Sequence, residues 1–323
     1  HGEFDSLDKW DPRYGYFSFG GLGKIPDQPY WYTWSPLQQA TFFNNNSALF
    51  LPGNSDLILH MHYGPTGKPL KDSSEIHLWF SSQPDRFQIH TAPLINPYGL
   101  TNGTFYLPAN TKKTFHSDYT LPFDIQVLSI TPQSNLFCRS WELYAKIPKN
   151  EVPVKLVKIR DWNFNWKQTY RPSNPIILPA GTIIHALANF DNTTENPCNP
   201  SDKPSDVIWG AHLFSDLFMV HFEYLPTKSL GDDIKMYIPS VVSGNELPIQ
   251  LEALKKGNYT FEITSIGGKR DPQINGFILK SGKQKFTVPI KDLVNGNYLL
   301  TIHNEANTVL AQSLFIKMWD KGL

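Results

Sequence analysis

The sequence has few of the features that mark membrane-spanning, disulfide-rich or nucleic-acid-binding proteins. No apolar stretch approaches the roughly 18 residues that a helix needs to cross a bilayer, and no signal-peptide pattern begins the chain. The 29 basic and 29 acidic residues balance and form no long run of either sign. We therefore expect no transmembrane segment, no nucleic-acid partner and no electrostatic attraction to anionic membranes.

Cysteine is also scarce, because only Cys138 and Cys198 occur among the 323 residues. They form either one disulfide or two buried thiols. A bridge between them would close a loop of about 60 residues, which is worth roughly 4 kcal/mol in the chain-entropy model. Such a bridge implies an oxidising compartment.

What the sequence does contain is a high density of aromatic and turn residues. Aromatic side chains make up 14% of the chain, and 26 residues are prolines. Short segments of alternating apolar and polar residues recur between the turns, which is typical of an all-β protein. Because 323 residues are many for one core, we expect two or three domains. Strands are expected early in the chain at 48–52, 56–63, 75–81, 87–94 and 103–107.

The most distinctive stretch is an apolar run, 57–59, that alternates into His60 and His62 and breaks at Gly64. The pattern predicts a buried strand just before a turn. Residues two apart in a strand face the same side, so both imidazoles could point at one site. The spacing suits metal ligands, although a pair of histidines satisfied by neighbouring side chains is the commoner case.

The residues that follow, His62-Tyr-Gly-Pro-Thr-Gly-Lys-Pro69 and then Leu78-Trp-Phe80, resemble the type II copper, ascorbate-dependent monooxygenases, relatives of peptidylglycine alpha-hydroxylating monooxygenase and dopamine beta-monooxygenase. The resemblance covers about residues 40–226. It implies two consecutive jelly-roll-like β-sandwiches, one copper that stores an electron and a second copper that activates oxygen. It also implies that His62 is a ligand of the first copper, that His60 is an additional histidine, and that the protein is secreted or extracytoplasmic.

In this family the other two ligands of the first copper are an adjacent His-His pair some sixty residues upstream. His1 lies 61 residues before His62. Three interpretations stay open: His1 is the second member of that pair, it is an arbitrary terminus of a processed or trimmed chain, or it binds copper through its amine and its imidazole. The candidate metal ligands are therefore His62, His60 and His1.

The second copper is where this sequence departs from the family. The family strand ends in Ile-x-Pro-His-x-His-Leu, whereas this chain has Ile130-Thr-Pro-Gln-Ser-Asn-Leu136. Gln133 and Asn135 thus replace two histidine ligands, and an amide oxygen is a weak donor to copper. Aligning Asp216 with the aspartate of the family's Asp-Glu-Met strand places Phe218 at the methionine ligand. Met219 is one residue further along the strand, and neighbouring residues of a strand point to opposite faces. It could therefore serve as the ligand only if a β-bulge intervenes.

Further motifs occur in family order downstream. Trp162, Phe164 and Trp166 follow one another at strand spacing, an aromatic stripe that favours core packing over a ligand site. The resemblance implies a partial first β-sandwich over residues 1–107 and a second over 108–227.

A separate unit is expected over residues 228–323. Its short alternating segments predict a small Ig-like β-sandwich. Within it, Leu293-Val-Asn-Gly-Asn-Tyr298 resembles the Leu-x-x-Gly-x-Tyr pattern of the C-terminal sorting domains of type IX secretion cargo in Bacteroidota. Any Ig-like domain with an Asn-Gly hairpin, as at Asn295-Gly296, could show the same short sequence pattern.

The expected function is an exported, copper-monooxygenase-like protein that has lost the oxygen-activating copper at Gln133, Asn135 and Phe218. It would carry no catalytic residues and act as a binding or assembly subunit with other surface or outer-membrane proteins. The alternative is a copper-dependent oxidoreductase or copper-binding protein that uses a residual site at His62 with His60 or His1. A third hypothesis is a sorting or adhesion protein whose function lies in residues 228–323.

Overall fold

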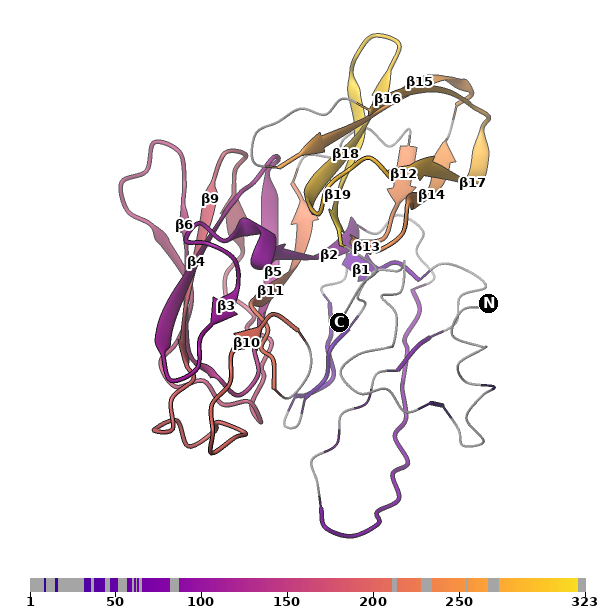
Figure 1. The fold of residues 1–323 in the computed structure, drawn as a ribbon. Helices are drawn as coiled ribbons and strands as arrows, with labels where there is room; N and C mark the ends of the chain where they lie inside the picture. Colours follow the sequence, from indigo (N-terminus) through magenta and orange to yellow (C-terminus); the bar gives the residue numbers. More distant parts are fainter. Residues whose placement is uncertain are drawn as a thin grey trace.

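The computed structural model confirms the all-β expectation: the residues that it describes form nineteen strands, β1 to β19, and one short 3-10 turn, η1 (Figure 1). The residues that the structure describes are 9, 15–16, 32–35, 38–43, 47–51, 57–59, 61, 63, 66–81, 87–210, 214–227, 234–253, 255–266 and 273–318, with the backbone alone for 273–278. No helix among them is long and apolar enough to span a bilayer.

The first β-sandwich consists of a five-stranded sheet, in the order β1-β2-β11-β5-β8, packed on a four-stranded sheet, in the order β4-β9-β6-β7, with a short pair β10-β3 beside them. Its strands are β1 (Ser47–Leu49), β2 (Phe87–Ile95), β3 (Tyr106–Leu107), β4 (Lys112–Thr120), β5 (Ile125–Gln133), β6 (Cys138–Lys146), β7 (Val154–Ile159), β8 (Ile176–Leu178), β9 (Ile183–Asp191), β10 (Val207–Ile208) and β11 (Met219–Pro226).

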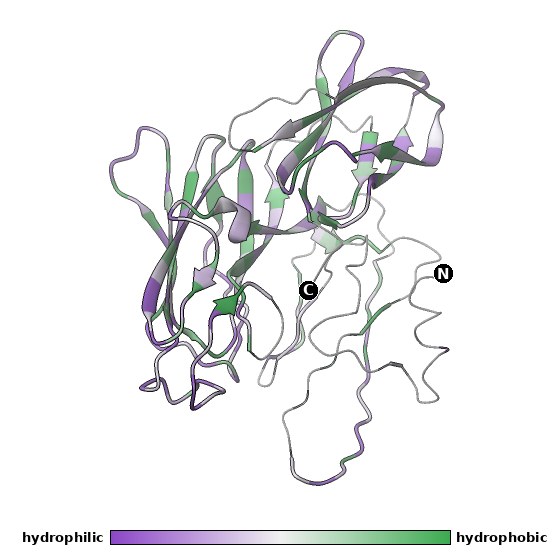
Figure 2. Cartoon of the chain, in the orientation of Figure 1, coloured by the Kyte–Doolittle hydropathy of each residue, from purple (hydrophilic) through white to green (hydrophobic). Residues whose placement is uncertain are grey.

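Strict alternation of side chains builds this sandwich. Along β4 the buried residues Phe115, Ser117 and Tyr119 alternate with more exposed ones, and β6 and β9 follow the same period of two. Apolar residues of both sheets meet in one core that includes Phe115, Trp141 and Phe222. Figure 2 shows the apolar residues alternating with polar ones along these strands.

The second β-sandwich packs a three-stranded sheet, β12-β14-β17, on a five-stranded sheet, β13-β19-β18-β15-β16. Its strands are β12 (Ile234–Tyr237), β13 (Val241–Val242), β14 (Glu246–Ala253), β15 (Gly257–Ser265), β16 (Gln273–Leu279), β17 (Gly282–Pro289), β18 (Gly296–Asn304) and β19 (Val309–Lys317). This unit has its own hydrophobic core, which includes Leu251, Phe261 and Leu300.

The two sandwiches are joined by side-chain contacts as well as by the chain. Leu314 of β19 is 5% exposed and belongs to the core of the first sandwich. The side-chain amide of Asn96, at the end of β2, donates to Asn297 Oδ1 at 2.8 Å. Asn96 is itself buried and also caps η1 (Pro97–Gly99). The C-terminal unit is therefore docked on β2.

These units differ in part from the domain boundaries predicted above. Strand β2 pairs with β11, so residues before and after the expected boundary at 107 and 108 share one sheet. The expected boundary at 227 and 228 lies between β11 and β12, where the chain passes from one core to the other. The difference arises because long-range pairing of β2, which local sequence patterns do not record, decides to which sheet it belongs.

The expected strands near the N-terminus also differ. Strand β2 matches the prediction at 87–94, and β1 and β3 fall within or beside the predictions at 48–52 and 103–107. Over 75–81 and the described part of 56–63 there is no strand. Leu57, Leu59 and Met61 are exposed, so the expected burial of this stretch is not observed in the residues that the structure describes.

The disulfide prediction is not borne out, since both cysteines are free thiols in the structure. Cys138, at the start of β6, is buried, and its Sγ lies 3.7 Å from the backbone oxygen of Ser140. Cys198 lies in the loop after β9 and is exposed. One thiol faces the core and the other faces solvent, so the two do not meet.

Candidate functional site

The candidate site lies on the face of the five-stranded sheet that points away from the core of the first sandwich. Strands β5 and β11 pair antiparallel, with Met219 opposite Gln133, His221 opposite Thr131 and Glu223 opposite Ser129. Directly opposite residues of an antiparallel pair share a face, and so do residues two apart on one strand. This register therefore gathers six mostly polar side chains on one surface.

Phe218 is not on this surface. It is fully buried, and its ring centroid lies 4.9 Å from that of Trp141, 6.3 Å from Phe115 and 6.5 Å from Phe105. The alignment that placed Phe218 at the methionine ligand is therefore off by one residue in space, because the side chain that faces Gln133 is Met219. A single step along a strand reverses the face, as noted above.

Asn135 belongs to a hydrogen-bonded corner of the backbone. Its N–H donates to Asp216 Oδ1 at 2.5 Å, and its side-chain amide donates to the carbonyl oxygen of Ser215 at 3.2 Å. Asp216 also accepts the backbone N–H groups of Phe137 at 2.9 Å and Leu217 at 2.7 Å. Asn135 thus serves to join the end of β5 to the segment that precedes β11.

Asp216 is the centre of this corner and is completely buried. Burial raises the pKa of its carboxyl group to about 7, although three backbone amides donate to it. The aspartate that appeared in the sequence as an alignment anchor is therefore a structural acceptor, held where no solvent reaches it.

The positions Gln133, Asn135 and Phe218 do not fit a copper ion. Two of them offer amides and the third a hydrocarbon ring, and Phe218 faces away from Gln133. Among the residues that the structure describes, no group of three or more His, Cys, Asp or Glu side chains is arranged to hold a metal.

His1, His60 and His62 lie outside the described residues, so their relative placement stays a prediction. Of their described neighbours, Tyr63 donates its hydroxyl to Asp72 Oδ2 at 2.7 Å. This hydrogen bond raises the pKa of Tyr63 and lowers that of Asp72.

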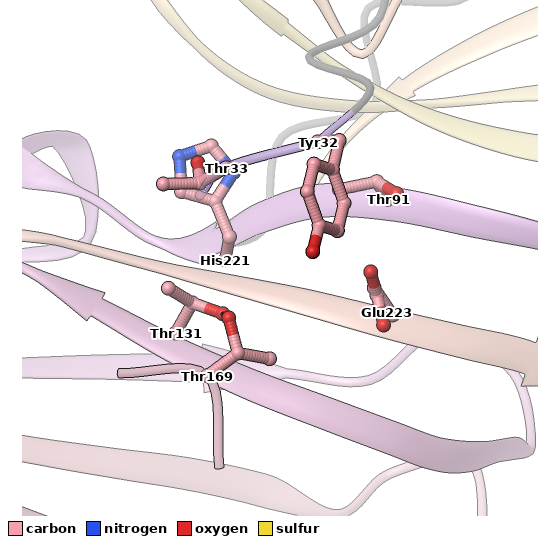
Figure 3. Close-up of a pocket in the computed structure, with 7 residues that line it drawn as sticks. All are labelled: Tyr32, Thr33, Thr91, Thr131, Thr169, His221 and Glu223. Carbon is pink, nitrogen blue, oxygen red and sulfur yellow. The ribbon is translucent and has the colours of Figure 1, made fainter. Parts of the chain in front are cut away.

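A small polar pocket opens on the same sheet face, between β2, β11 and β5 on one side and residues 32–33 and 169 on the other (Figure 3). Its cavity of about 20 Å³ has room for about one water molecule. It is lined by Tyr32, Thr33, Thr91, Thr131, Thr169, His221 and Glu223. The hydroxyl oxygen of Thr91 is buried there and has no hydrogen-bond partner among the described residues.

Glu223 is the charged group of this pocket, and its charge is balanced. Its Oε2 accepts hydrogen bonds from Ser129 Oγ at 2.7 Å and from Arg171 Nη1 at 2.9 Å. Arg171 also reaches Thr41 through its other terminal nitrogen, at 3.4 Å. Because Glu223 is mostly buried, this ion pair helps fix residues 38–43 and 167–171 over the sheet.

Met219 and His221 are in direct contact beside the pocket. The Sδ atom of Met219 lies 3.1 Å from His221 Nε2. Burial lowers the pKa of His221 to about 4, so its imidazole is neutral at physiological pH. No sequence motif singles out His221; the alternation of Met219, His221 and Glu223 along one strand is the signal that could have placed it on this face.

Comparison with known proteins adds little to this picture. No protein-family model matches the sequence, and no curated protein matches it. Several solved structures match at low similarity. A β-glucuronidase from Ruminococcus gnavus, in complex with N1-substituted uronic isofagomine, is 10% identical over 74% of this chain with a TM-score of 0.20. The chain spans 47% of that enzyme, less than half of its length.

Two smaller proteins match at the same level. A fucolectin from the serum of Morone saxatilis is 10% identical, with 73% of this chain and 97% of the lectin covered and a TM-score of 0.23. The adhesin domain of Epf from Streptococcus pyogenes is 9% identical, with 69% and 80% covered and a TM-score of 0.20. Likenesses this distant assign neither a family nor a function to the chain.

Proposed function

We propose that this protein is a copper-monooxygenase-like β-sandwich protein that lacks the oxygen-activating copper. In this proposal it is exported and acts at the cell surface as a binding or assembly subunit for other surface or outer-membrane proteins. The single observation that carries the proposal is the fate of the ligand-equivalent positions. Asn135 is bound into the Asp216 corner, and Gln133, which lies opposite Met219 on the polar sheet surface, offers only an amide where the family has a histidine.

The free energy that the fold would lose if a ligand position were freed supports this interpretation. Freeing Asn135 would leave the carbonyl oxygen of Ser215 without this donor. Buried groups that lose their partners destabilise a fold by about 1–3 kcal/mol each. The scaffold therefore depends on the residues that replaced the ligands.

The catalytic half of the proposal is tested by oxygen uptake. The full chain, loaded with one or two equivalents of copper and supplied with ascorbate, is expected to consume oxygen no faster than the same copper without protein. Gln133→Ala and Asn135→Ala are expected to leave that rate unchanged. Protein-dependent uptake that either substitution abolishes would refute the proposal.

The binding half is tested on intact cells that produce the protein. Cross-linking of exposed proteins followed by mass spectrometry is expected to recover this chain joined to other surface proteins. External protease is expected to degrade it without lysis. Recovery of the chain solely from the cytoplasm, uncross-linked, would contradict this half alone.

The second candidate is a copper-binding protein or oxidoreductase with a residual site at His62 and either His60 or His1. The spacing of His60 and His62 in the sequence favours it. Electron paramagnetic resonance of the copper(II)-loaded chain should then give a multi-nitrogen signal that disappears in His62→Ala. A spectrum unchanged by this substitution would exclude the candidate.

A sorting role for the C-terminal sandwich rests on the Leu293–Tyr298 phrase. Deleting residues 228–323 would be a poor test, because Leu314 and Asn297 of this unit contact the first sandwich. A better test fuses residues 228–323 to an unrelated exported reporter. Display of the fusion on the cell surface would support the role, and release of the reporter into the medium would contradict it.

A further inference from the structure

The outer face of the four-stranded sheet, β4-β9-β6-β7, takes no part in the site described above. Its strands turn alternate residues into the core, so the residues between them point to solvent. Figure 1 shows β4, β6 and β9 at the outer side of the first sandwich, away from β2 and β11. The outward side chains of this sheet therefore form an open surface.

Hydrogen bonding and ring stacking hold a row of side chains that crosses this surface. Asp118 of β4 pairs with His185 of β9, which pairs in turn with Tyr144 of β6. Asp118 Oδ1 lies 2.7 Å from His185 Nδ1, and the rings of His185 and Tyr144 are stacked with their centroids 4.8 Å apart. Because each side chain is fixed by its neighbour, the row is organised before any ligand arrives.

Along β9 the same surface carries a stripe that is only partly exposed to water. Ile183 and Leu187 lie two residues before and after His185, so the three side chains share the outward face, and all three are half-buried. Tyr144 borders the stripe on β6 and is half-buried as well. The stripe is thus apolar and aromatic along its length, whereas mostly polar side chains of β4 and β6 line its two sides.

This arrangement complements a sugar ring. A pyranose has a face of C–H groups, which packs on apolar side chains and is attracted to the negative face of an aromatic ring, and an edge of hydroxyl groups. Partners for those hydroxyls lie beside the stripe: Asp118 is 46% exposed and can accept, and the Tyr144 hydroxyl has no hydrogen-bond partner among the described residues. A peptide strand would instead need free backbone groups, and those of β9 and β6 are used in the sheet.

The charge of the surface selects an acidic sugar. Lys155 of β7 is the cross-strand partner of Tyr144, and Lys146 lies two residues further along β6. Both ammonium groups are exposed and have no ion pair among the described residues, whereas the carboxylate of Glu142 is paired with Lys158 at 2.9 Å. Two such cations beside an aromatic ring complement a carboxylate or a sulfate group on the sugar.

We propose that the outer face of β4-β9-β6-β7 binds an acidic oligosaccharide. One sugar ring packs on Tyr144 and the stripe of β9, and its anionic group lies at Lys146 and Lys155. The site needs no metal and does not rest on the function proposed above. An open surface without a deep pocket binds weakly, so a dissociation constant of about 10 μM to 1 mM is expected.

The test screens the labelled full chain on an array of uronic-acid, sulfated and neutral oligosaccharides, followed by calorimetric titration with the acidic oligosaccharide that binds most tightly. Tyr144→Leu should weaken its binding about tenfold or more, because the ring is lost while apolar bulk remains. Lys146→Gln combined with Lys155→Gln should weaken it by a similar factor and reduce its dependence on salt.

Matched controls replace the same kinds of residue elsewhere on the surface. Trp166→Leu removes an exposed aromatic ring, and Lys235→Gln removes an exposed ammonium group of the second sandwich. Both variants should keep the parent affinity. Thermal unfolding of every variant shows whether it is folded.

The proposal is overturned if no acidic oligosaccharide on the array binds at about 1 mM, or if a folded Tyr144→Leu protein keeps the parent affinity. Equal binding of poly-glutamate or of anionic lipid vesicles would also overturn it, because the surface would then select charge and not a sugar. Each of these results leaves the proposed function standing. Protein-dependent oxygen uptake with copper would refute that function and leave the sugar site intact.

Discussion

Replacing Phe218 by alanine tests the register on which the description of the sheet face depends. In the structure the Phe218 ring is completely buried between Trp141, Phe105 and Phe115. Truncating a fully buried phenylalanine removes its transfer free energy and leaves a cavity, which together cost about 3–5 kcal/mol. Met219 is only half-buried, so Met219→Ala should cost about 1–2 kcal/mol.

The assay is equilibrium unfolding in urea, followed by tryptophan fluorescence because Trp141 packs against the substituted ring. Both variants should keep the parent dependence on urea concentration and shift the midpoint, with Phe218→Ala shifting it further. Phe218→Leu serves as a control, since it retains much of the apolar volume and should recover part of the loss. If Phe218→Ala costs less than about 1 kcal/mol, or less than Met219→Ala, Phe218 does not face the core and the register is wrong.

Four other predictions follow from single groups. Asp216→Asn should lower the free energy of unfolding by about 2–4 kcal/mol, because an amide cannot accept all three backbone N–H groups; an unchanged urea midpoint would contradict this. Burial lowers the pKa of His90 to about 4, so the folded state binds fewer protons than the unfolded state between pH 4 and about 6.5, and stability falls as pH falls through this window. Between pH 6.5 and pH 4, the free energy of unfolding of His90→Phe should therefore fall by up to about 3 kcal/mol less than that of the parent. Parallel profiles of unfolding free energy against pH would refute the lowered pKa of His90. A maleimide reagent should label Cys198 in the folded protein and Cys138 only after unfolding, as read by peptide mass spectrometry; simultaneous labelling would show that Cys138 is not buried. Leu314→Asp should allow the two sandwiches to unfold at separate temperatures in calorimetry, whereas a single unchanged transition would show that this contact does not couple them.

The relation between Gln133 and Met219 shows how an alignment by motif can misplace a residue. The alignment set Phe218 beside Gln133, whereas the pairing of β5 with β11 puts Met219 opposite Gln133. Motifs do not record a shift of one residue between strands. Because of this shift, the Met219 thioether lies on the same face as the Gln133 amide, and the Phe218 ring lies in the core.

A similar limit applies to the candidate ligands near the N-terminus. The spacing of His60 and His62 predicts imidazoles on one face only where a strand forms, and strand formation requires a partner. The described residues next to these histidines are exposed and do not belong to a strand. At the described residues 57–59, 61 and 63, local alternation occurs without the long-range pairing that turns it into a strand.

From the sequence alone followed the fold class and the strand at 87–94, because a period of two and frequent turn residues are local properties of the chain. It also followed that Gln133 and Asn135 are poor copper donors, since donor strength is a property of the side chain itself. Tertiary structure alone decided that β2 joins the sheet of β11, that Cys138 and Cys198 stay apart, and that Met219, His221 and Gln133 share a surface. Each of these depends on hydrogen-bond register or burial between residues far apart in the chain, and no local pattern encodes that.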